Sequence, residues 1–294
     1  MLVLQLLVNG IVAGCGYALV ALGFALIYNT TRIFHFAHGA IYMLGAYLFY
    51  STYVLWSLPL WLAALLTVVL ITATGVLVDK LVHLPLDRQD ASLLIHLLSS
   101  LGLYIVIVNT VAMFYGNETK VLSPGVQTTY SAGGVILTVV QIATVVVAVV
   151  LFIGLVLLLR NTRLGGQLRA MRDDPELVAV MGINPRTLRK IVFGLGSALA
   201  AAAAMLMALD VGIHPHIGLA AVLNGAVAVI IGGIGIFEGA ALGAILLGLL
   251  QSLAVWQASA RWEEAVTFVV LILFLLFRPE GILGTRRRVE EVAT

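Results

Sequence analysis

The sequence has few charged residues, and this shortage restricts the kind of protein it can be. Only 10% of its 294 residues are Asp, Glu, Lys or Arg, whereas 62% are hydrophobic. An ordinary soluble domain has about 25% charged and about 45–50% apolar residues. A single core of this size cannot bury so much apolar surface, so we expect lipid to be the solvent of this chain.

Cysteine and the common catalytic motifs are also scarce. The single Cys15 excludes a disulfide framework within the chain and a cysteine-based metal site. No basic tract is dense enough for nucleic acid binding. The sequence contains no G-x-x-x-x-G-K-[ST], G-x-S-x-G or H-E-x-x-H motif, and no convincing pair of carboxylates. We therefore predict no enzyme activity, no catalytic residues, no cofactor and no nucleic acid partner.

Long uncharged runs predict membrane-spanning helices. A charge at the bilayer centre costs at least about 2.5–3.5 kcal/mol, and a helix needs roughly 20 apolar residues to cross. One span fits before Arg32, as a retained first helix, and two fit in residues 33–78 with a turn near 57–59. The further candidates are residues 91–117, 121–159, 191–209, 211–237, 239–260 and 265–277. The Gly-rich segment 218–235 fits either a crossing or a broken or re-entrant helix, so eight to nine spans are expected.

The predicted fold is therefore an all-α polytopic membrane protein with a single transmembrane domain. We divide it into N-terminal helices (1–159), a loop (160–190), C-terminal helices (191–277) and a tail (278–294). Seven of the sixteen Lys and Arg lie within 160–190 and four at or after Arg278, so both regions are predicted to be cytoplasmic. The short loop with Lys80 and Arg88 is placed on the same side, and the loop at 117–134 and the N-terminus outside.

The loop contains a compact polar stretch, LGGQLRAMRDDPELVAVMGINPRTLRK (164–190), that we name the cassette. Asp174 followed by Pro175 predicts the start of a short helix, which Gly182 ends. Leu177, Val178 and Met181 would share one side of it. A preceding short helix around 166–171 would turn Leu168 and Met171 to its apolar face and Arg169 and Arg172 outward. Such a unit fits an amphipathic helix on anionic lipid, or a knob that docks into a groove of a soluble partner.

Four motifs along almost the whole chain resemble one transporter family. They are GYALVALGFALIYNTTRIFHFAHGAIYMLGAY (16–47), LRAMRDDPELVAVMGIN (168–184), GGIGIFEGAALGAILLGLLQ (232–251) and LLFRPEGILG (275–284). The chain looks like a permease of branched-chain amino acid ABC importers, of the type with a short N-terminus. It departs from the usual pattern at Asn29 (usually Gly), at His35 (usually Asn), and at Ile236 and Glu238. If these positions line the path, the substrate differs from Leu, Ile or Val; other importers of this family carry other amino acids, urea or short amides.

The resemblance implies partners and site residues. It implies a second permease, identical or different, two ATPase subunits, an extracytoplasmic binding protein and an inner-membrane location. Residues 167–184 would then be the element that couples this chain to an ATPase. The predicted coupling residues are Arg169, Asp174, Pro175, Leu177, Val178, Met181, Gly182 and Asn184. The predicted residues of the translocation path are Asn29, His35, His38 and Glu238.

Other interpretations stay open at this point. The chain could be a secondary transporter or channel that works alone, although no charged pair lies unambiguously inside a span. A membrane metalloenzyme would use the histidines, but neither His35 with His38 nor His214 with His216 has a carboxylate or cysteine at ligand spacing. For His38, we expect a helix cap or a hydrogen bond between helices. Glu238 and Asp210 end apolar runs and fit the membrane interface equally well.

Overall fold

The computed structural model describes residues 2–122, 128–259 and 262–284. Helices make up most of this chain. Their bounds are α1 Leu2–Thr31, α2 Ala37–Tyr50, α3 Leu60–Val78, α4 Leu84–Asp87, α5 Leu93–Tyr115, α6 Val139–Asn161, α7 Arg163–Asp173, α8 Pro175–Val180, α9 Pro185–Asp210, α10 Ile217–Gly232, α11 Phe237–Ala258 and α12 Glu263–Phe277. Two π-helical turns, η1 Ser51–Leu55 and η2 Asp79–His83, continue α2 and α3. The predicted class, an all-α polytopic membrane protein, is confirmed.

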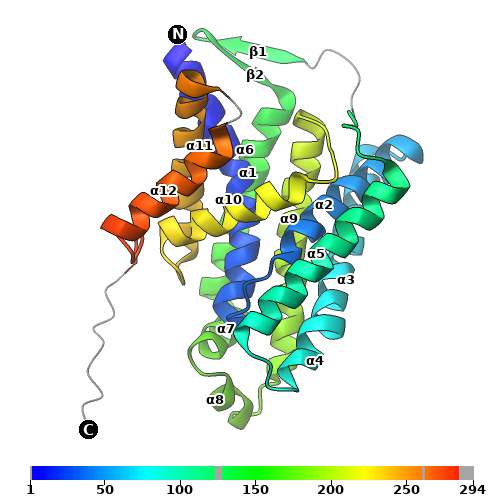
Figure 1. Cartoon of the computed structure of the whole chain (residues 1–294), viewed down its shortest axis with the longest axis vertical. Helices are drawn as coiled ribbons and strands as arrows, with labels where there is room; N and C mark the ends of the chain where they lie inside the picture. The colour runs from blue at the N-terminus through cyan, green and yellow to red at the C-terminus, as the bar shows by residue number, and fades with distance from the viewer. Residues whose placement is uncertain (1, 123–127, 260–261, 285–294) are drawn as a thin grey trace.

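The number of long spans is smaller than predicted. Among the described residues, six helices are long and apolar enough to cross a membrane: Leu2–Thr31, Leu60–Asp87, Leu93–Tyr115, Val139–Asn161, Pro185–Asp210 and Phe237–Gln257. The predicted count of eight to nine included three shorter helices, α2, α10 and α12. For example, the 16 residues of α10 extend about 24 Å, less than the roughly 30 Å hydrocarbon core. Segment 218–235 is therefore a short helix that crosses α1 at a steep angle (Figure 1).

The molecule has two ends along its long axis (Figure 1). One end carries α4 and the cassette helices α7 and α8. The other carries the N-terminus and a small hairpin of β1 (Thr129–Ala132) and β2 (Val135–Thr138), antiparallel to each other. The hairpin begins within the loop predicted at 117–134, of which residues 123–127 lie outside the described residues. Gln5 of α1 holds the hairpin by hydrogen bonds to and from the backbone of Ile136.

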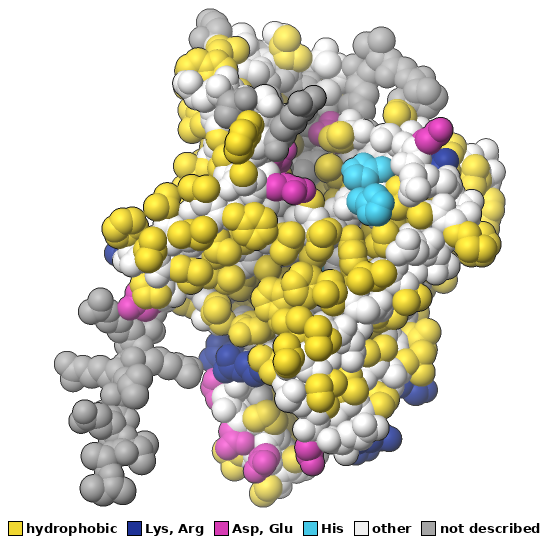
Figure 2. Space-filling model, in the orientation of Figure 1, with side chains coloured by type: hydrophobic (Ala, Val, Ile, Leu, Met, Phe, Trp, Pro, Cys, Tyr) yellow, Lys and Arg dark blue, Asp and Glu magenta, His cyan; other side chains and the backbone are white. Residues whose placement is uncertain are grey.

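A broad apolar surface separates these ends. Figure 2 shows hydrophobic side chains across the middle of the molecule and most visible charges near its extremities. Large apolar side chains point outward from several helices, among them Phe114 (75% exposed), Leu276 (71%) and Val150 (61%). Such an extensive exposed apolar surface would be unfavourable in water and is favourable against lipid tails. The described surface therefore agrees with lipid as solvent.

Small residues bring α1 and α11 into backbone contact. A Cβ added to Gly14 would lie 2.7 Å from the Cα of Ile245, and one added to Gly248 would lie 2.4 Å from the oxygen of Gly10. These approaches leave no room for a side chain. Gly16, two residues from Gly14, has no atom within 4 Å of such a Cβ and does not belong to this contact. Helix α1 also packs on α9 and α10, which makes it the centre of the bundle.

Candidate functional site

The cassette folds as two short helices with well-formed caps. The Thr162 hydroxyl accepts a hydrogen bond from the Gly165 amide at the start of α7. The Asp174 carboxylate accepts from the amides of Glu176 and Leu177, and Pro175 occupies the first position of α8. Gly182 has φ of +80°, the left-handed conformation that ends the helix. The predicted start and stop of α8 are confirmed, and Asn184 caps α9 in the same way through the amide of Arg186.

The apolar residues of the cassette divide into two groups. Leu168, Met171 and Val178 are buried against the rest of the chain. Leu177 (56% exposed), Val180 (83%) and Met181 (69%) point outward at the end of the molecule. The prediction that Val178 shares one side with Leu177 and Met181 is therefore wrong, because Val178 anchors α8 while its neighbours face outward. The outward group is an apolar tip on a capped helix.

Two arginines of α7, both predicted to point outward, bond to the backbone of the bundle; Arg172 is half-buried, whereas Arg169 stays exposed. Arg169 donates a hydrogen bond to the backbone oxygen of Leu159, near the end of α6. Arg172 donates to the oxygen of Gly235 and pairs with Asp173. The reason is that carbonyls at the end of a helix, and in the turn before α11, lack backbone donors of their own. These arginines hold the cassette to the bundle.

Glu238 lies at the same end as the cassette. At the start of α11, its carboxylate pairs with Arg160 at 2.5 Å, and both side chains are partly exposed. This pair joins the beginning of α11 to the end of α6. The expectation that Glu238 sits at an interface agrees with this placement, whereas its part in a path stays a prediction.

The other predicted path residues lie at a break between α1 and α2. Arg32 takes φ of +59°, and residues 32–35 are not helical before α2 begins at Ala37. Non-helical backbone is tolerated at membrane depth only where protein or a water-filled cavity surrounds it. Asn29, His35 and His38 are all buried. Neither Asn29 amide atom makes a hydrogen bond within the described chain. His38 of α2 approaches the backbone of Val20 in α1, the kind of contact between helices that was expected for it.

His35 is the end of a buried chain of polar contacts. Its Nδ1 lies 3.0 Å from Nε2 of His83 in η2. The other ring nitrogen of His83, Nδ1, lies 3.4 Å from Nδ1 of His96 in α5. His96 Nε2 lies 2.9 Å from Oδ1 of Asp87. Three histidines thus connect the break to the end of the molecule that carries the cassette.

An arginine of α9 completes this cluster. Arg189 contacts Oδ1 of Asp79 through Nε at 2.5 Å and binds Oδ2 of Asp87 through a terminal nitrogen. Its guanidinium also lies over the ring of Phe193, which packs edge-on against His35. Arg189 is the fifth residue of α9 and lies in the last part of the cassette. We call His35, His83, His96, Asp87, Asp79 and Arg189 the histidine cluster.

The described residues of the histidine cluster lack the geometry of a metal site. No group of three possible ligands converges on one point within the described residues. The reason is visible at His83, whose two nitrogens point to two different neighbours, so the rings form a line rather than a cage. A metalloenzyme gains no support from this arrangement.

Of the histidine cluster, only His35 was predicted from the sequence as a site residue. The stretch with Lys80 and Arg88 was predicted to be a loop, but the structure continues α3 through η2 into α4. Asp79, His83 and Asp87 recur every four residues, so they lie on one face of a helix. That spacing was the available signal, and it indicates a helix face turned towards protein rather than a solvated loop.

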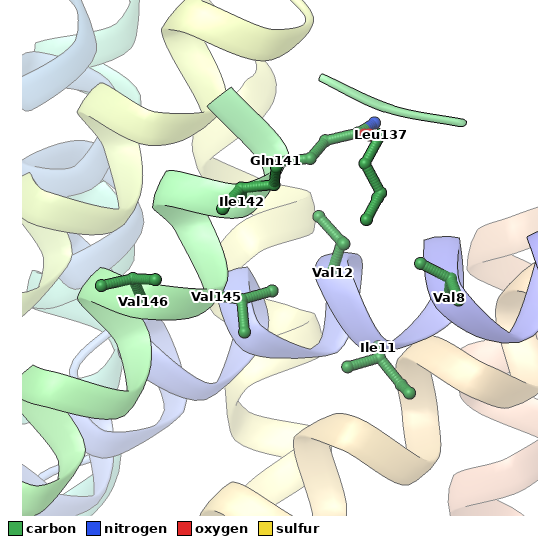
Figure 3. Close-up of a pocket in the computed structure, with 8 residues that line it drawn as sticks. All are labelled: Val8, Ile11, Val12, Leu137, Gln141, Ile142, Val145 and Val146. Atoms are coloured by element: carbon green, nitrogen blue, oxygen red, sulfur yellow. The ribbon is translucent and has the colours of Figure 1, made fainter. Parts of the chain in front are cut away.

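An apolar cavity of about 220 Å³ lies at the opposite end, between α1, β2 and α6 (Figure 3). Val8, Ile11 and Val12 face Ile142, Val145 and Val146 across it, with Leu137 and Gln141 at its rim (Figure 3). Gln141 is its polar residue, and that side chain is engaged in the capping box with Thr138. The cavity offers almost no partners for the charged groups of an amino acid.

Comparison with known proteins places this architecture in a family. The family described as branched-chain amino acid transport system / permease component matches residues 6–275. The chain belongs to this family of membrane permeases, and the resemblance inferred from the four motifs is confirmed. It is thus a multi-pass permease component of a transport system, not an ATPase.

Named relatives cover nearly the whole chain. The high-affinity branched-chain amino acid transport system permease protein BraD of Pseudomonas aeruginosa is 35% identical over 303 residues, with 98% of both chains covered. The corresponding protein LivH of Escherichia coli K12 is 31% identical, covering 98% of this chain and 97% of the relative. A probable permease LivH of Methanocaldococcus jannaschii is 28% identical, covering 90% and 88%. No solved structure matches significantly.

Proposed function

We propose that this chain is the transmembrane permease subunit of an ABC importer that translocates branched-chain amino acids by alternating access. ATP hydrolysis by partner ATPases would supply the energy, because the sequence has no phosphate-binding loop of its own. Support comes from the family and from relatives that are named as branched-chain amino acid permeases over nearly their full length.

The observation that carries the coupling role is the apolar tip of α8. Leu177, Val180 and Met181 are exposed on a helix whose other face and both ends are held by the protein. A rigid apolar knob is suited to a groove on a soluble partner. We therefore assign the tip, with Arg169, Asp174, Pro175, Gly182 and Asn184 as its support, to docking on an ATPase subunit.

The proposed assembly contains a second permease, two ATPases and an extracytoplasmic binding protein in a plasma or inner membrane. The cassette end would be cytoplasmic, because Arg160, Arg163, Arg186 and Lys190 gather around it and cytoplasmic loops are enriched in basic residues. The end with the N-terminus and the hairpin would face the binding protein. Residues of the α1–α2 break, Asn29, His35 and His38, would belong to the path, with Glu238 at its cytoplasmic end.

Docking is tested by co-purification with the ATPase subunits. Leu177→Glu places a charge on the apolar tip, and the amount of ATPase retained should fall at least about tenfold, since a hot-spot change costs about 2 kcal/mol or more and each 1.4 kcal/mol is tenfold. Val211→Glu is the matched control, because Val211 is 63% exposed just beyond the other end of α9. If both variants retain the ATPase like the unmodified chain, the tip is not the docking element.

Substrate and energy source are tested in proteoliposomes. The complete complex should accumulate leucine, isoleucine or valine only with ATP and the binding protein. Uptake of urea or short amides in place of these amino acids would instead favour another substrate class, which the departure at His35 makes worth testing. Uptake by this chain alone, driven by a gradient, would refute the ABC mechanism.

Orientation is tested with two acidic, exposed positions at opposite ends. In a Cys15→Ala background, Glu176→Cys lies in the cassette and Glu118→Cys in the loop after α5. A membrane-impermeant maleimide added to intact cells should label only Glu118→Cys. Labelling of Glu176→Cys alone would invert the molecule and remove the cassette from any cytoplasmic ATPase.

A further inference from the structure

The histidine cluster connects the cassette end of the molecule to the α1–α2 break. Its members come from four separate parts of the chain: the break, the continuous helix η2–α4, α5 and α9. All three histidines are at most 4% exposed, and Asp79 is 2% exposed. Such a buried polar network is costly unless its hydrogen bonds are satisfied, so the positions of its protons matter.

The contacts determine which nitrogen of each histidine carries a proton. A neutral imidazole has one N–H and one bare nitrogen. His96 faces the Asp87 carboxylate with Nε2, so Nε2 carries the proton and Nδ1 is bare. His83 must then donate from Nδ1 to His96, which leaves its Nε2 as an acceptor.

The same reasoning applies to His35, the last histidine in this series of contacts. His35 donates from Nδ1 to His83 Nε2 at 3.0 Å, with the Ser100 hydroxyl oxygen further from the same nitrogen at 3.5 Å, and its own Nε2 is then bare. This nitrogen is buried and makes no hydrogen bond within the described residues. All three histidines therefore point their N–H groups towards Asp87. Through His96 and His83, the Asp87 carboxylate determines which ring nitrogen of His35 carries the proton. The positive charge of Arg189 disfavours a further positive charge on the neighbouring rings of His83 and His35.

Asp87 links the three histidines to Arg189 of α9. One carboxylate oxygen accepts from His96 and the other from Arg189, so the two contacts share one side chain. Arg189 lies five residues after Asn184, where the predicted coupling element 167–184 ends, and it also holds Asp79. A movement of the start of α9 therefore shifts the partly exposed Asp87 side chain or breaks its bond to Arg189, because that bond joins the two elements directly.

We propose that Arg189 and Asp87 are positioning residues that transmit movement of the cassette to His35 through His96 and His83. The inference rests on the proposed coupling of the cassette to an ATPase. In the arrangement described here, Arg189 holds Asp87 against His96, and His35 presents a bare Nε2 at the break. Displacement of α9 releases this constraint and changes what His35 can accept or donate.

The isosteric variant Asp87→Asn gives a sharp test. In this variant, the single side-chain oxygen at position 87 accepts a hydrogen bond from Arg189, because Arg189 is the charged donor. The NH₂ group of the same side chain then faces His96. His96 Nε2 must then be bare, and each later contact reverses in turn until His35 carries its proton on Nε2. Asp90→Asn is the matched control, because Asp90 is exposed three residues further on and the charge change is the same.

The readout is ¹⁵N NMR of the complete complex labelled at histidine, in which protonated and bare ring nitrogens have well-separated shifts. The expected result is an Nδ1-protonated His83 and His35 in the unmodified protein and in Asp90→Asn, and Nε2 protonation of both in Asp87→Asn. An Nε2-protonated His35 in the unmodified protein, or no change at His35 in Asp87→Asn, overturns the proposal. If Asp87→Asn does not fold, His96→Phe, which keeps a ring but breaks the chain, should give mixed tautomers at His83 and His35; an unchanged His35 overturns the proposal equally.

Coupling is measured in the same samples as substrate moved per ATP hydrolysed. Asp87→Asn should lower this ratio by about fivefold or more, the lower end of typical couplings between sites, with subunit assembly and ATP hydrolysis retained. An unchanged ratio overturns the transmission role. If the unmodified complex hydrolyses ATP but moves no amino acid, the proposed function fails instead, while the NMR result still decides whether the hydrogen-bond chain exists.

Discussion

The close contact of α1 with α11 predicts opposite effects for two identical substitutions. Gly14 and Gly16 lie two residues apart in α1, on either side of the buried Cys15. A Cβ at Gly14 would be 2.7 Å from the Cα of Ile245 and 3.0 Å from the oxygen of Ala244, whereas a Cβ at Gly16 would meet nothing within 4 Å. The two sites thus differ in packing but share helix, depth and chemical change.

The magnitudes follow from two effects. Replacing Gly by Ala inside a helix stabilises it by about 0.5–1 kcal/mol, because glycine loses more backbone entropy on folding. Overpacking against a neighbour that cannot move typically costs about 1–3 kcal/mol, and here the neighbour is the backbone of α11. We therefore expect Gly16→Ala to raise the free energy of unfolding by about 0.5–1 kcal/mol and Gly14→Ala to lower it by about 1–2 kcal/mol.

The assay is unfolding in mixed micelles by titration with SDS, and Cys15 supplies a probe. This buried thiol, 6% exposed, should react with a fluorogenic maleimide only when α1 separates from its neighbours. Labelling should therefore begin at a lower SDS fraction in Gly14→Ala and at a slightly higher one in Gly16→Ala. Equal shifts in the two variants would show that the helices do not meet at Gly14, and the packing described for α1 would be refuted.

Three further predictions concern a helix cap, a buried hydrogen bond and a histidine. Asp174→Ala removes the cap of α8 and should cost that helix about 1 kcal/mol, seen as faster amide exchange at 176–180 with the bundle unchanged. Thr267 bonds to Gln251 and Asn224 between α12, α11 and α10, so Thr267→Val should lower stability in the SDS titration by about 0.6–1.7 kcal/mol, the measured range for membrane hydrogen bonds. Partial burial, and then the nearby His216, lower the pKa of His214. The unfolded chain therefore binds more protons than the folded one, so stability should fall as the pH drops below about 6.5. His214→Gln should reduce this dependence of stability on pH.

The predicted features that proved reliable were those that repeat locally along the chain. The uncharged runs located α1, α5, α6, α9 and α11, although several bounds moved by several residues. The cap of α8 was read directly from Asp174, Pro175 and Gly182, because caps depend on neighbouring residues. The errors arose where a short run was assumed to cross the bilayer, as in α12, or where charges were assumed to mark a loop, as at Asp79.

Which side of each short helix faces the protein could not be predicted. Val178 and Leu177 are adjacent and equally apolar, yet one is buried and the other exposed, because α8 is only six residues long and its contacts come from α7 and α9. Likewise, Arg169 was expected to face outward, but it satisfies the backbone oxygen of Leu159 ten residues earlier. The assignment of the cassette and path residues to coupling and translocation remains a prediction.

The sequence by itself determined the solvent, the class of structure and the family. Its composition requires lipid, and lipid requires helices whose backbone hydrogen bonds are made within each segment, so these conclusions depend only on local composition. The tertiary structure alone decided that Asp79 and Asp87 meet Arg189, about one hundred residues later, and that three histidines line up between them and the break. Contacts of that kind depend on which helix faces pack together, and no local pattern records that choice.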